Sequence, residues 1–463
     1  MKTKITFLLL LFIILSSCTK IPYGQVPDDD EPNSNITYQD INVDEGISSE
    51  ETNIFISPNN VIVKYQPQVT PEEREAIRDN YPIIEFKQCN CGETNIELWI
   101  FDPNISEVEI EGVVERLSRT SQRGTTRGER SFDIVLSPVG PYTIQGQGVD
   151  GEEEALIANA GNSKINIAVI DTGLDFYRYL FTNEPKRFLF PSGKFGSCYP
   201  TTSGWNFTQQ PNNRLFADGN GHGTYITKII TDELDSKNLN YSILPLKVFD
   251  DAGKGSYWNV LCALSYIKQL NENGANISIV NASFGGQMPR EIFEDPAPGE
   301  QKNIFAQSIE DLNSAGALVI TSAGNDNKDV DQGSNGDFIS SFRETNILTV
   351  GGYEYDTLNP GSLPIRLHPL SNYGSKGSID IALAFNDYRI ILDNSDPFLK
   401  NRVTLQGTSY ATAAMSGIAG SVINQVGRVP AEELKNLIFN LAIDAPQLNG
   451  KIDERRVIPR ATN

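Results

Sequence analysis

The C-terminal two thirds of the chain alternates apolar strands with helices, and this alternation constrains the fold more than any other feature. Three predicted strands are apolar along nearly their whole length, at 165–170, 277–280 and 317–320. Helices are predicted between and after them, at 257–270 and 304–312. A strand without a polar face must be covered on both sides, as in a parallel sheet between helices. The sequence therefore predicts an α/β domain of three layers with a mainly parallel sheet.

Residues 54–145 have a different order of elements and predict a small separate α+β domain. Thr70 and Ser106 each begin a capping box, with Glu73 and Glu109 three residues later, and so mark the starts of two helices. The predicted strands of this domain lie at 61–65, 83–86, 96–100 and 132–136. The resulting order, β-α-β-β-α-β, is that of a ferredoxin-like split unit.

A basic stretch lies between the second of these helices and the last strand. Its arginines are at positions 116, 119, 123, 127 and 130. We interpret the stretch as a solvated, protease-sensitive loop. The alternative is a docking strip in an otherwise acidic protein.

The first 17 residues predict an export signal. Lys2 and Lys4 precede a mostly apolar run that is eleven residues long, whereas a membrane span needs about 20. The residues Leu15-Ser16-Ser17-Cys18 resemble the lipobox of bacterial lipoproteins, which implies cleavage before Cys18 and a lipid on that cysteine. The alternative is a plain secretory signal with an incidental cysteine. We expect an exported lipoprotein anchored at the periplasmic face or the cell surface, with the outer membrane as the favoured location.

Residues 18–53 predict an acidic, flexible tether between this anchor and the folded domains. Residues 19–53 hold one Lys and nine acidic residues, and few large apolar groups that could offset the entropy of ordering. The whole chain has a net charge of −21. Such a charge disfavours nucleic acid as a partner, because its phosphates would be repelled.

Four cysteines remain besides Cys18: Cys89, Cys91, Cys198 and Cys262. An exported chain can form disulfides. The short spacing disfavours a bond between Cys89 and Cys91, but the sequence does not choose among the three possible connectivities. The chain has no C-x-x-C motif and only two histidines, so no metal site is predicted.

Four segments lie where such a sheet would place functional loops. They are Asp171-Thr172-Gly173, Asn220-Gly221-His222-Gly223-Thr224, Thr321-Ser322-Ala323-Gly324-Asn325 and Gly407-Thr408-Ser409-Tyr410-Ala411-Thr412. The first and third follow predicted strands, and ligands of open α/β sheets bind beyond the carboxyl ends of strands. Each segment alone has an ordinary explanation as a turn, a glycine-rich loop or a helix cap. Together they favour a catalytic site.

A serine nucleophile needs an adjacent base, and a base that works near neutral pH is usually histidine. Of the two histidines, His222 lies between glycines, whereas His368 lies in an irregular polar stretch. His222 is therefore the predicted base for Ser409. Asp171 could orient the imidazole, while Asn325 and the backbone N–H of Ser409 could donate hydrogen bonds to an oxyanion.

The Asp171, His222 and Ser409 segments resemble the three signature segments of the subtilase family, and the resemblance covers about residues 155–445. It implies a serine endopeptidase in which Asp171 is the orienting acid, His222 the general base and acid, Ser409 the nucleophile and Asn325 the oxyanion donor. Polypeptides are the implied substrates, and no cofactor is required. Calcium sites are common in the family, but no ligand cluster here is specific enough to name.

The resemblance also implies where substrate binds. Ser283-Phe284-Gly285-Gly286 would pair with an extended substrate, and Ser322-Ala323-Gly324 would line the other side of the main specificity pocket. Phe284 indicates only that part of the cleft is apolar. The sequence gives no preferred residue before the cut.

Residues 54–145 resemble the inhibitory propeptide of this family, and residues 146–463 would then form the peptidase domain. The resemblance implies an intramolecular chaperone that the enzyme cuts off itself, and we expect the cut between Val139 and Asp150. Two alternatives to a general protease stay open: a maturation protease dedicated to one partner, and a catalytically dead binding module.

Two departures from the family pattern stand out. Ala413-Ala414 replaces the usual Pro-His after the nucleophile segment, and we expect activity to survive this change. The stretch from Asp171 to His222 is also long. Because it includes Cys198 and Trp205, it predicts an insertion near the substrate cleft.

Overall fold

The computed structural model describes residues 41–42, 53–89, 91, 95–119, 124–136, 163–175, 188–196, 203–208, 216–294, 301–355, 365–391 and 402–459. The predicted export signal, Cys18, Cys198 and the predicted propeptide cut lie outside these residues. The described residues, from Ile41 onward, belong to one compact unit. In the described part of the chain, no helix has the length and apolar character needed to cross a membrane.

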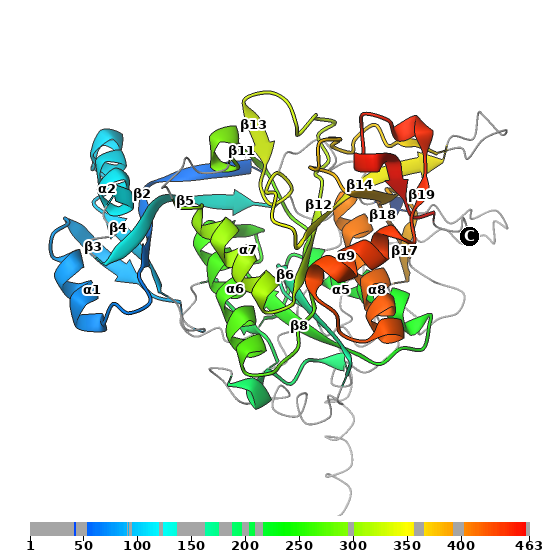
Figure 1. Cartoon of the computed structure of the whole chain (residues 1–463), viewed down its shortest axis with the longest axis horizontal. Helices are drawn as coiled ribbons and strands as arrows, with labels where there is room; N and C mark the ends of the chain where they lie inside the picture. Colours follow the sequence, from blue (N-terminus) through cyan, green and yellow to red (C-terminus); the bar gives the residue numbers. More distant parts are fainter. Residues whose placement is uncertain are drawn as a thin grey trace, which may run out of the picture. The chain divides into compact units, whose positions relative to one another are not determined.

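A ten-stranded, mainly parallel sheet forms the centre of this unit (Figure 1). Its path is β19 (Ile443–Asp444), β20 (Arg456–Val457), β16 (Ile381–Ala384), β14 (Ile347–Tyr355), β12 (Leu318–Ser322), β10 (Ile279–Ala282), β6 (Ile165–Asp171), β8 (Tyr241–Lys247) and β7 (Trp205–Asn206), with β15 (Ile365–Leu367) beside β14. Only the β19–β20 and β14–β15 pairs are antiparallel. The predicted parallel sheet is confirmed.

Helices cover both faces of the sheet. One face carries α5 (His222–Asp235), α8 (Thr408–Val426) and α9 (Ala431–Phe439); the other carries α6 (Tyr257–Glu272) and α7 (Ile304–Ser314). Strand β6 shows why its sequence is apolar throughout: Ile167 and Val169 pack in the first layer, while Ala168 and Ile170 pack in the second. This is the predicted three-layer arrangement.

The N-terminal residues form an antiparallel sheet in the order β3 (Ile83–Lys87), β4 (Ile96–Phe101), β2 (Asn53–Tyr65), β5 (Thr125–Val135) and β9 (Lys254–Ser256). Helices α1 (Pro71–Arg78) and α2 (Glu107–Arg119) complete the predicted β-α-β-β-α-β order. Both predicted capping boxes are present: the Thr70 and Ser106 hydroxyls accept from Glu73 and Glu109 backbone nitrogens at 3.3 Å. Val61, Trp99 and other apolar residues of the sheet pack on α2.

The expectation of a basic loop is wrong for residues 125–130, which belong to β5 and pair with β2. The arginines are tolerated in a strand because they have partners: Arg127 pairs with Glu129, and Arg130 with Glu111 at 2.8 Å. Arg127 also donates to the Gln301 carbonyl.

The N-terminal sheet is joined to the helices α6 and α7 in several ways. Strand β5 pairs with β9, which directly precedes α6. The buried Glu129 caps α7, accepting from the Ile304 backbone at 2.9 Å, and also accepts from Tyr257 at 3.1 Å. Burial, opposed by Arg127, raises the pKa of the Glu129 carboxyl. A disulfide between Cys89 and Cys262 links the sheet to α6 covalently.

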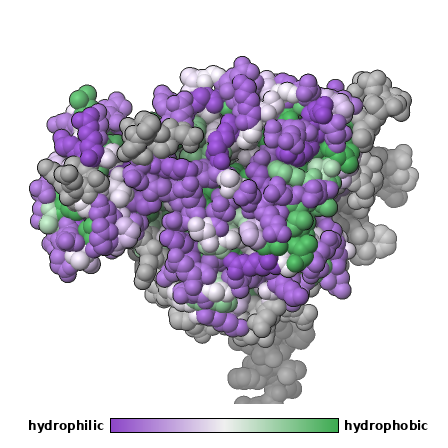
Figure 2. Space-filling model, viewed as in Figure 1, coloured by the Kyte–Doolittle hydropathy of each residue, from purple (hydrophilic) through white to green (hydrophobic). Residues whose placement is uncertain are grey.

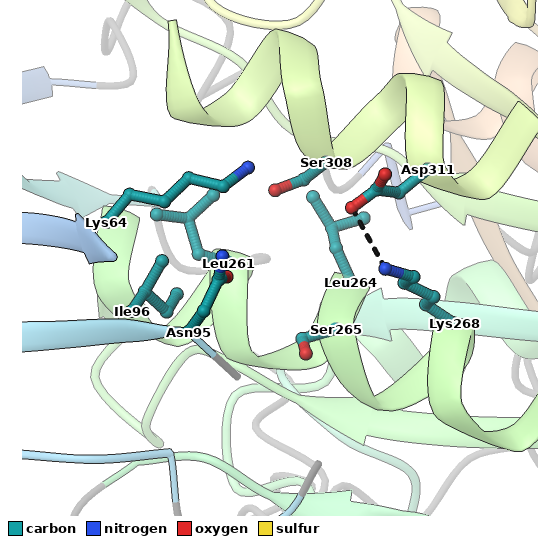
Figure 3. Close-up of a pocket in the computed structure, with 9 residues that line it drawn as sticks. All are labelled: Lys64, Asn95, Ile96, Leu261, Leu264, Ser265, Lys268, Ser308 and Asp311. Carbon is teal, nitrogen blue, oxygen red and sulfur yellow. Dashed lines mark hydrogen bonds and ion pairs between the residues drawn. The ribbon is translucent and has the colours of Figure 1, made fainter. Parts of the chain in front are cut away.

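A small cavity of about 50 Å³ marks the edge of this contact (Figure 3). Lys64 extends from β2 toward α7 and donates to Gln307 at 2.6 Å. Burial lowers the pKa of Lys64. Lys268 and Asp311 form an ion pair at 3.2 Å across the same cavity. The contact between the N-terminal sheet and the helices α6 and α7 is therefore polar at this edge. Farther in it is apolar, because Ile62, Leu98 and Phe132 join the core around the two helices.

Two smaller sheets complete the described fold. Strands β11 (Gln287–Pro289) and β13 (Asn335–Asp337) form an antiparallel pair. Strand β18 (Arg402–Leu405) lies between β17 (Tyr388–Ile391) and β1 (Ile41–Asn42). The prediction of a wholly flexible tether is therefore wrong at residues 41–42, where the exposed edge of β18 gains a strand partner. Short 3₁₀ helices lie at Ser192–Phe195, Arg290–Ile292, Pro446–Leu448 and Asp453–Arg455.

The cysteine pairing that the sequence left open is partly resolved. Cys89 pairs with Cys262, 173 residues away. Cys91 is disulfide-bonded as well. On the outside, hydrophilic residues dominate the face in Figure 2, as the net charge of −21 would suggest.

Candidate active site

The predicted acid and base meet at the carboxyl edge of the central sheet. Asp171 is the last residue of β6, and His222 is the first residue of α5. The His222 Nδ1 atom lies 2.8 Å from Oδ1 and 2.9 Å from Oδ2 of Asp171. Both side chains are buried. A carboxylate in this position fixes the imidazole tautomer and leaves Nε2 to act as a base.

A buried aspartate, Asp218, holds the start of α5 in place. Its carboxylate accepts from the backbone nitrogens of Asn220 at 3.0 Å, Gly221 at 2.8 Å and Thr224 at 3.0 Å, and from the Thr224 hydroxyl at 2.7 Å. These are the donors that a helix start leaves without partners. Asp218 thereby orients the first turn of α5, which carries His222.

Glycine at position 223 allows α5 to approach the end of β6. A β-carbon there would lie 3.0 Å from the Gly173 nitrogen and 3.1 Å from the Asp171 β-carbon. The Gly223 backbone also donates to the Thr172 hydroxyl at 2.8 Å. The two signature segments are therefore packed backbone to backbone, which explains why glycine flanks the histidine.

Ser409 lies in the first turn of α8, next to the other two segments. Its Oγ donates to the Ser283 carbonyl at 3.1 Å, and the Ser283 hydroxyl lies 3.1 Å from the Ser409 carbonyl. Within the described residues, no hydrogen bond joins Ser409 Oγ to His222. Catalytic hydrogen bonds commonly close only when substrate binds. The backbone N–H of Ser409 is at a helix start, where it suits an anion.

Asn325 follows β12 and is oriented by the residue before Ser409. Its Oδ1 accepts from the Thr408 backbone nitrogen at 2.9 Å and from the Thr408 hydroxyl at 3.0 Å. With the oxygen engaged, Nδ2 is left as a donor, and it has no hydrogen-bond partner among the described residues. This is the geometry that an oxyanion donor requires.

The two predicted substrate segments leave adjacent parallel strands. Ser283–Gly286 follows β10, and Ser322–Gly324 ends and follows β12. Because β10 and β12 are paired, both segments emerge at the edge that carries Asp171. Phe284 is buried against Phe249, with ring centroids 5.0 Å apart, so its side chain packs in the core.

The chain is similar to a known family of proteins. Residues 162–457, more than half of the chain, match the model described as the subtilase family. The chain belongs to the subtilase family.

Relatives of this subtilase include several serine proteases. An alkaline serine protease of Corniculantispora psalliotae is 22% identical over 358 residues, covering 73% of this chain and 74% of the relative. Serine protease AprX of Bacillus subtilis is 24% identical over 254 residues (48% and 53%). The subtilisin-like serine protease AsES of Sarocladium strictum is 28% identical over 228 residues (49% and 50%). The chain thus spans about half the length of the last two.

Solved structures show the same fold. The epidermin leader peptide processing serine protease of Staphylococcus aureus aligns over 87% of this chain and 97% of its own, with 14% identity and a TM-score of 0.54. A second structure of that protease aligns with a TM-score of 0.51, 14% identity and coverages of 86% and 97%. At this identity the likeness is one of fold.

The departures from the subtilase pattern leave the site intact. Helix α8 runs without interruption through Ala413-Ala414, both of which are buried, so proline is not needed for this geometry. Trp205 lies in β7, at the edge of the sheet next to β8. His368 stacks on Phe385 at 3.8 Å and accepts from the Leu370 nitrogen at 3.2 Å, in keeping with a packing role.

Sequence reasoning missed several groups around the site. Asp218 orients the turn that carries His222, and Thr408 orients Asn325. Only their places in the sequence, four residues before His222 and directly before Ser409, could have drawn attention to them. Lys247, at the end of β8, donates to the Thr172 carbonyl at 2.6 Å. Burial and the charge of Asp218 raise the pKa of Asp175 to about 7. In the parts of the chain described, no group of three or more His, Cys, Asp or Glu side chains could hold a metal ion.

Proposed function

We propose that this subtilase is an active serine endopeptidase with Ser409 as nucleophile, His222 as general base and acid, and Asp171 as orienting acid. The observation that carries the proposal is the contact of His222 Nδ1 with both oxygens of Asp171. A catalytically inactive binding module would not require a histidine held in this tautomer. Asn325, oriented by Thr408, completes the set as oxyanion donor.

The reaction follows from these positions. His222 Nε2 takes the Ser409 proton as Oγ attacks the scissile carbonyl, and the leaving amine then receives that proton. Asn325 Nδ2 and the Ser409 N–H bind the oxyanion, one such donor being worth about 3 kcal/mol. Water, activated by His222, hydrolyses the acyl-enzyme and regenerates Ser409. An extended substrate would add a strand against Ser283–Gly286.

The N-terminal ferredoxin-like unit serves in this proposal as an inhibitory propeptide and intramolecular chaperone. Its support is the contact with α6 and α7, which includes the β5–β9 pair and the Glu129 cap on α7. These contacts present a template for two helices of the peptidase domain. The self-cut is expected between Val139 and Asp150.

The anchor is a further part of the proposal. Lipid on Cys18 would hold the exported enzyme at the membrane, at the periplasmic face or the cell surface, and the outer membrane is the location we propose. A Cys18→Ser variant should then be found in the soluble fraction after cell lysis or in the medium. Retention of this variant in washed membranes would contradict lipidation.

The activity is tested with purified parent chain and Ser409→Ala. The parent should shorten itself and hydrolyse peptides, whereas Ser409→Ala should do neither while keeping the same circular dichroism spectrum. A parent that is inert toward itself and toward a peptide library would favour the binding module. A single narrow cleavage motif in that library would favour a dedicated maturation protease over a degradative enzyme.

A further inference from the structure

A buried carboxylate, that of Asp337, lies against the first substrate segment. Asp337 ends β13 and pairs with Gln287 of β11, which directly follows Gly286. The Phe338 nitrogen donates to the Gly286 carbonyl at 2.7 Å, and the Gly286 nitrogen lies 3.4 Å from Asp337 Oδ1. The β11–β13 pair thus places the carboxylate of Asp337 beside Gly286 of the substrate segment, although the two residues are 51 positions apart in the sequence.

The same carboxylate lies against the second segment. A β-carbon on Gly324 would be 3.2 Å from Asp337 Oδ2, and one on Gly285 would collide with Oδ1. Gly324 has φ +94°, which other residues rarely adopt, and Asn325 follows it. Because neither glycine has a side chain, the carboxylate can lie between the two segments, next to the glycine that precedes the oxyanion donor Asn325.

Asp337 lacks the partner that a buried charge requires. The residue is 2% exposed, yet the Gly286 nitrogen and the Ser340 hydroxyl are both 3.4 Å from Oδ1, at the limit of hydrogen bonding. Among the described residues, Oδ2 accepts no hydrogen bond and no cation forms an ion pair with Asp337. Leaving a buried carboxylate unpaired is costly.

The surroundings leave room for such a partner. Asp337 lines a cavity of about 390 Å³ together with Gln287, Asn372 and residues between 328 and 336. Burial and the charge of Asp326 raise the pKa of the Asp337 carboxyl to about 8, while Lys328, which lines the same cavity, acts in the opposite direction. A cation brought by a ligand would lower that pKa and stabilise the ionised carboxylate.

We propose that Asp337 forms the base of the primary specificity pocket and selects Lys or Arg as the substrate residue before the scissile bond. The proposal rests on the proposed peptidase function. A Lys ammonium or an Arg guanidinium would supply the missing donors, and Arg can do so through two hydrogen bonds. A Phe or Leu side chain would leave the carboxylate unpaired, and Glu would be repelled.

The test uses processed parent enzyme and fluorogenic peptides that differ only at this position, with Arg, Lys, Phe, Leu or Glu. We expect kcat/KM for Arg and Lys to exceed that for Phe by about 100-fold or more. Asp337→Asn should lose most of the advantage of Arg and Lys over Phe. Asp380→Asn is the matched control, because it removes a buried carboxylate that pairs with Lys435 at the other end of the sheet.

The outcomes separate the two proposals. If the parent cleaves none of the peptides and behaves like Ser409→Ala, the proposed peptidase function fails. If the parent cleaves Phe or Leu peptides as well as Arg peptides, Asp337 does not set specificity although the peptidase function stands. The parent profile decides this even if Asp337→Asn does not fold. An unchanged Arg preference in folded Asp337→Asn would also overturn the inference.

Discussion

Both carboxylate oxygens of Asp171 lie within hydrogen-bond distance of a single His222 nitrogen, Nδ1, at 2.8 and 2.9 Å. The ring is therefore held from one side, and its Nε2 is directed away from Asp171. The arrangement depends on ionised Asp171, since an amide could present an N–H to Nδ1 and favour the wrong tautomer.

Asp171→Asn should therefore lower kcat by about 10⁴-fold, as measured for the corresponding change in another serine protease triad. The fold should persist, because the new side chain has almost the same volume. Peptide hydrolysis and thermal unfolding of the same preparation check both parts. A variant with near-parental turnover would contradict the orienting role.

Asn325→Ala should lower kcat by roughly 100- to 1000-fold with little change in KM, because the lost hydrogen bond forms mainly in the transition state. Thr408→Val should have a smaller effect of the same kind, since it removes the hydroxyl 3.0 Å from Asn325 Oδ1. Ser421→Ala, farther along α8, is the control and should match the parent. An increase in KM alone would mean that Asn325 binds the ground state instead.

The preference for Arg over Phe should depend on pH. The pKa of Asp337 is raised to about 8, so the free enzyme loses affinity for Arg peptides as pH falls and the carboxylate takes up a proton. The ratio of the two kcat/KM values should rise with pH and level off above about 8. The ratio cancels titrations that affect both substrates equally. A flat ratio in the parent, equal to that of Asp337→Asn, would contradict this prediction.

The raised pKa of Asp337 also affects how the stability of the folded enzyme depends on pH. A carboxyl whose pKa is raised on folding contributes stability below its unfolded pKa and loses that contribution as pH rises through the folded value. The unliganded enzyme should therefore become less stable toward pH 8, and Asp337→Asn should show a weaker decline in unfolding temperature over that range.

The expected position of the propeptide cut and the proposed selectivity for Lys or Arg together predict that each chain cuts itself. Residues 131–163 contain neither Lys nor Arg. A second enzyme molecule should then cut poorly between Val139 and Asp150, whereas the chain's own active site benefits from high effective concentration. The rate of self-cutting should be independent of protein concentration. Processed enzyme should leave this segment of Ser409→Ala intact, as mass spectrometry of the fragments would show; efficient cutting there would refute the argument.

Much of the site could be predicted because its parts are local in sequence. The Asp171, His222 and Ser409 segments each contain their functional residue together with the glycines or helix start that position it. The main sheet was equally predictable, since strands such as β6 are apolar on both faces. Strand β5 was harder, because its arginines resemble a solvated loop until Glu111 and Glu129 are placed beside them.

Asp337 shows what sequence reasoning could not reach. It lies in a run of Gly, Ser and Asn that is typical of a turn, and nothing nearby suggests a binding role. Its position depends on the pairing of β11 with β13, a contact between segments about 50 residues apart. The Cys89–Cys262 bond is similar, since its partners become neighbours only when the N-terminal sheet packs on α6.

Processing should leave both products joined. After the cut, a non-reducing gel should show them migrating together because Cys89 and Cys262 lie on opposite sides of the expected site. Reduction should separate them. Separation without a reductant would show that no disulfide spans the cut.

The Cys89–Cys262 bond also bears on where the mature enzyme resides. Cys18 precedes the expected cut and Ser409 follows it, so hydrolysis of the backbone alone would free the catalytic part from the lipid proposed on Cys18. The disulfide keeps the two products covalently linked after the backbone is cut. Whether the protease works at the membrane or diffuses away would then be decided by the redox state of its surroundings, not by proteolysis.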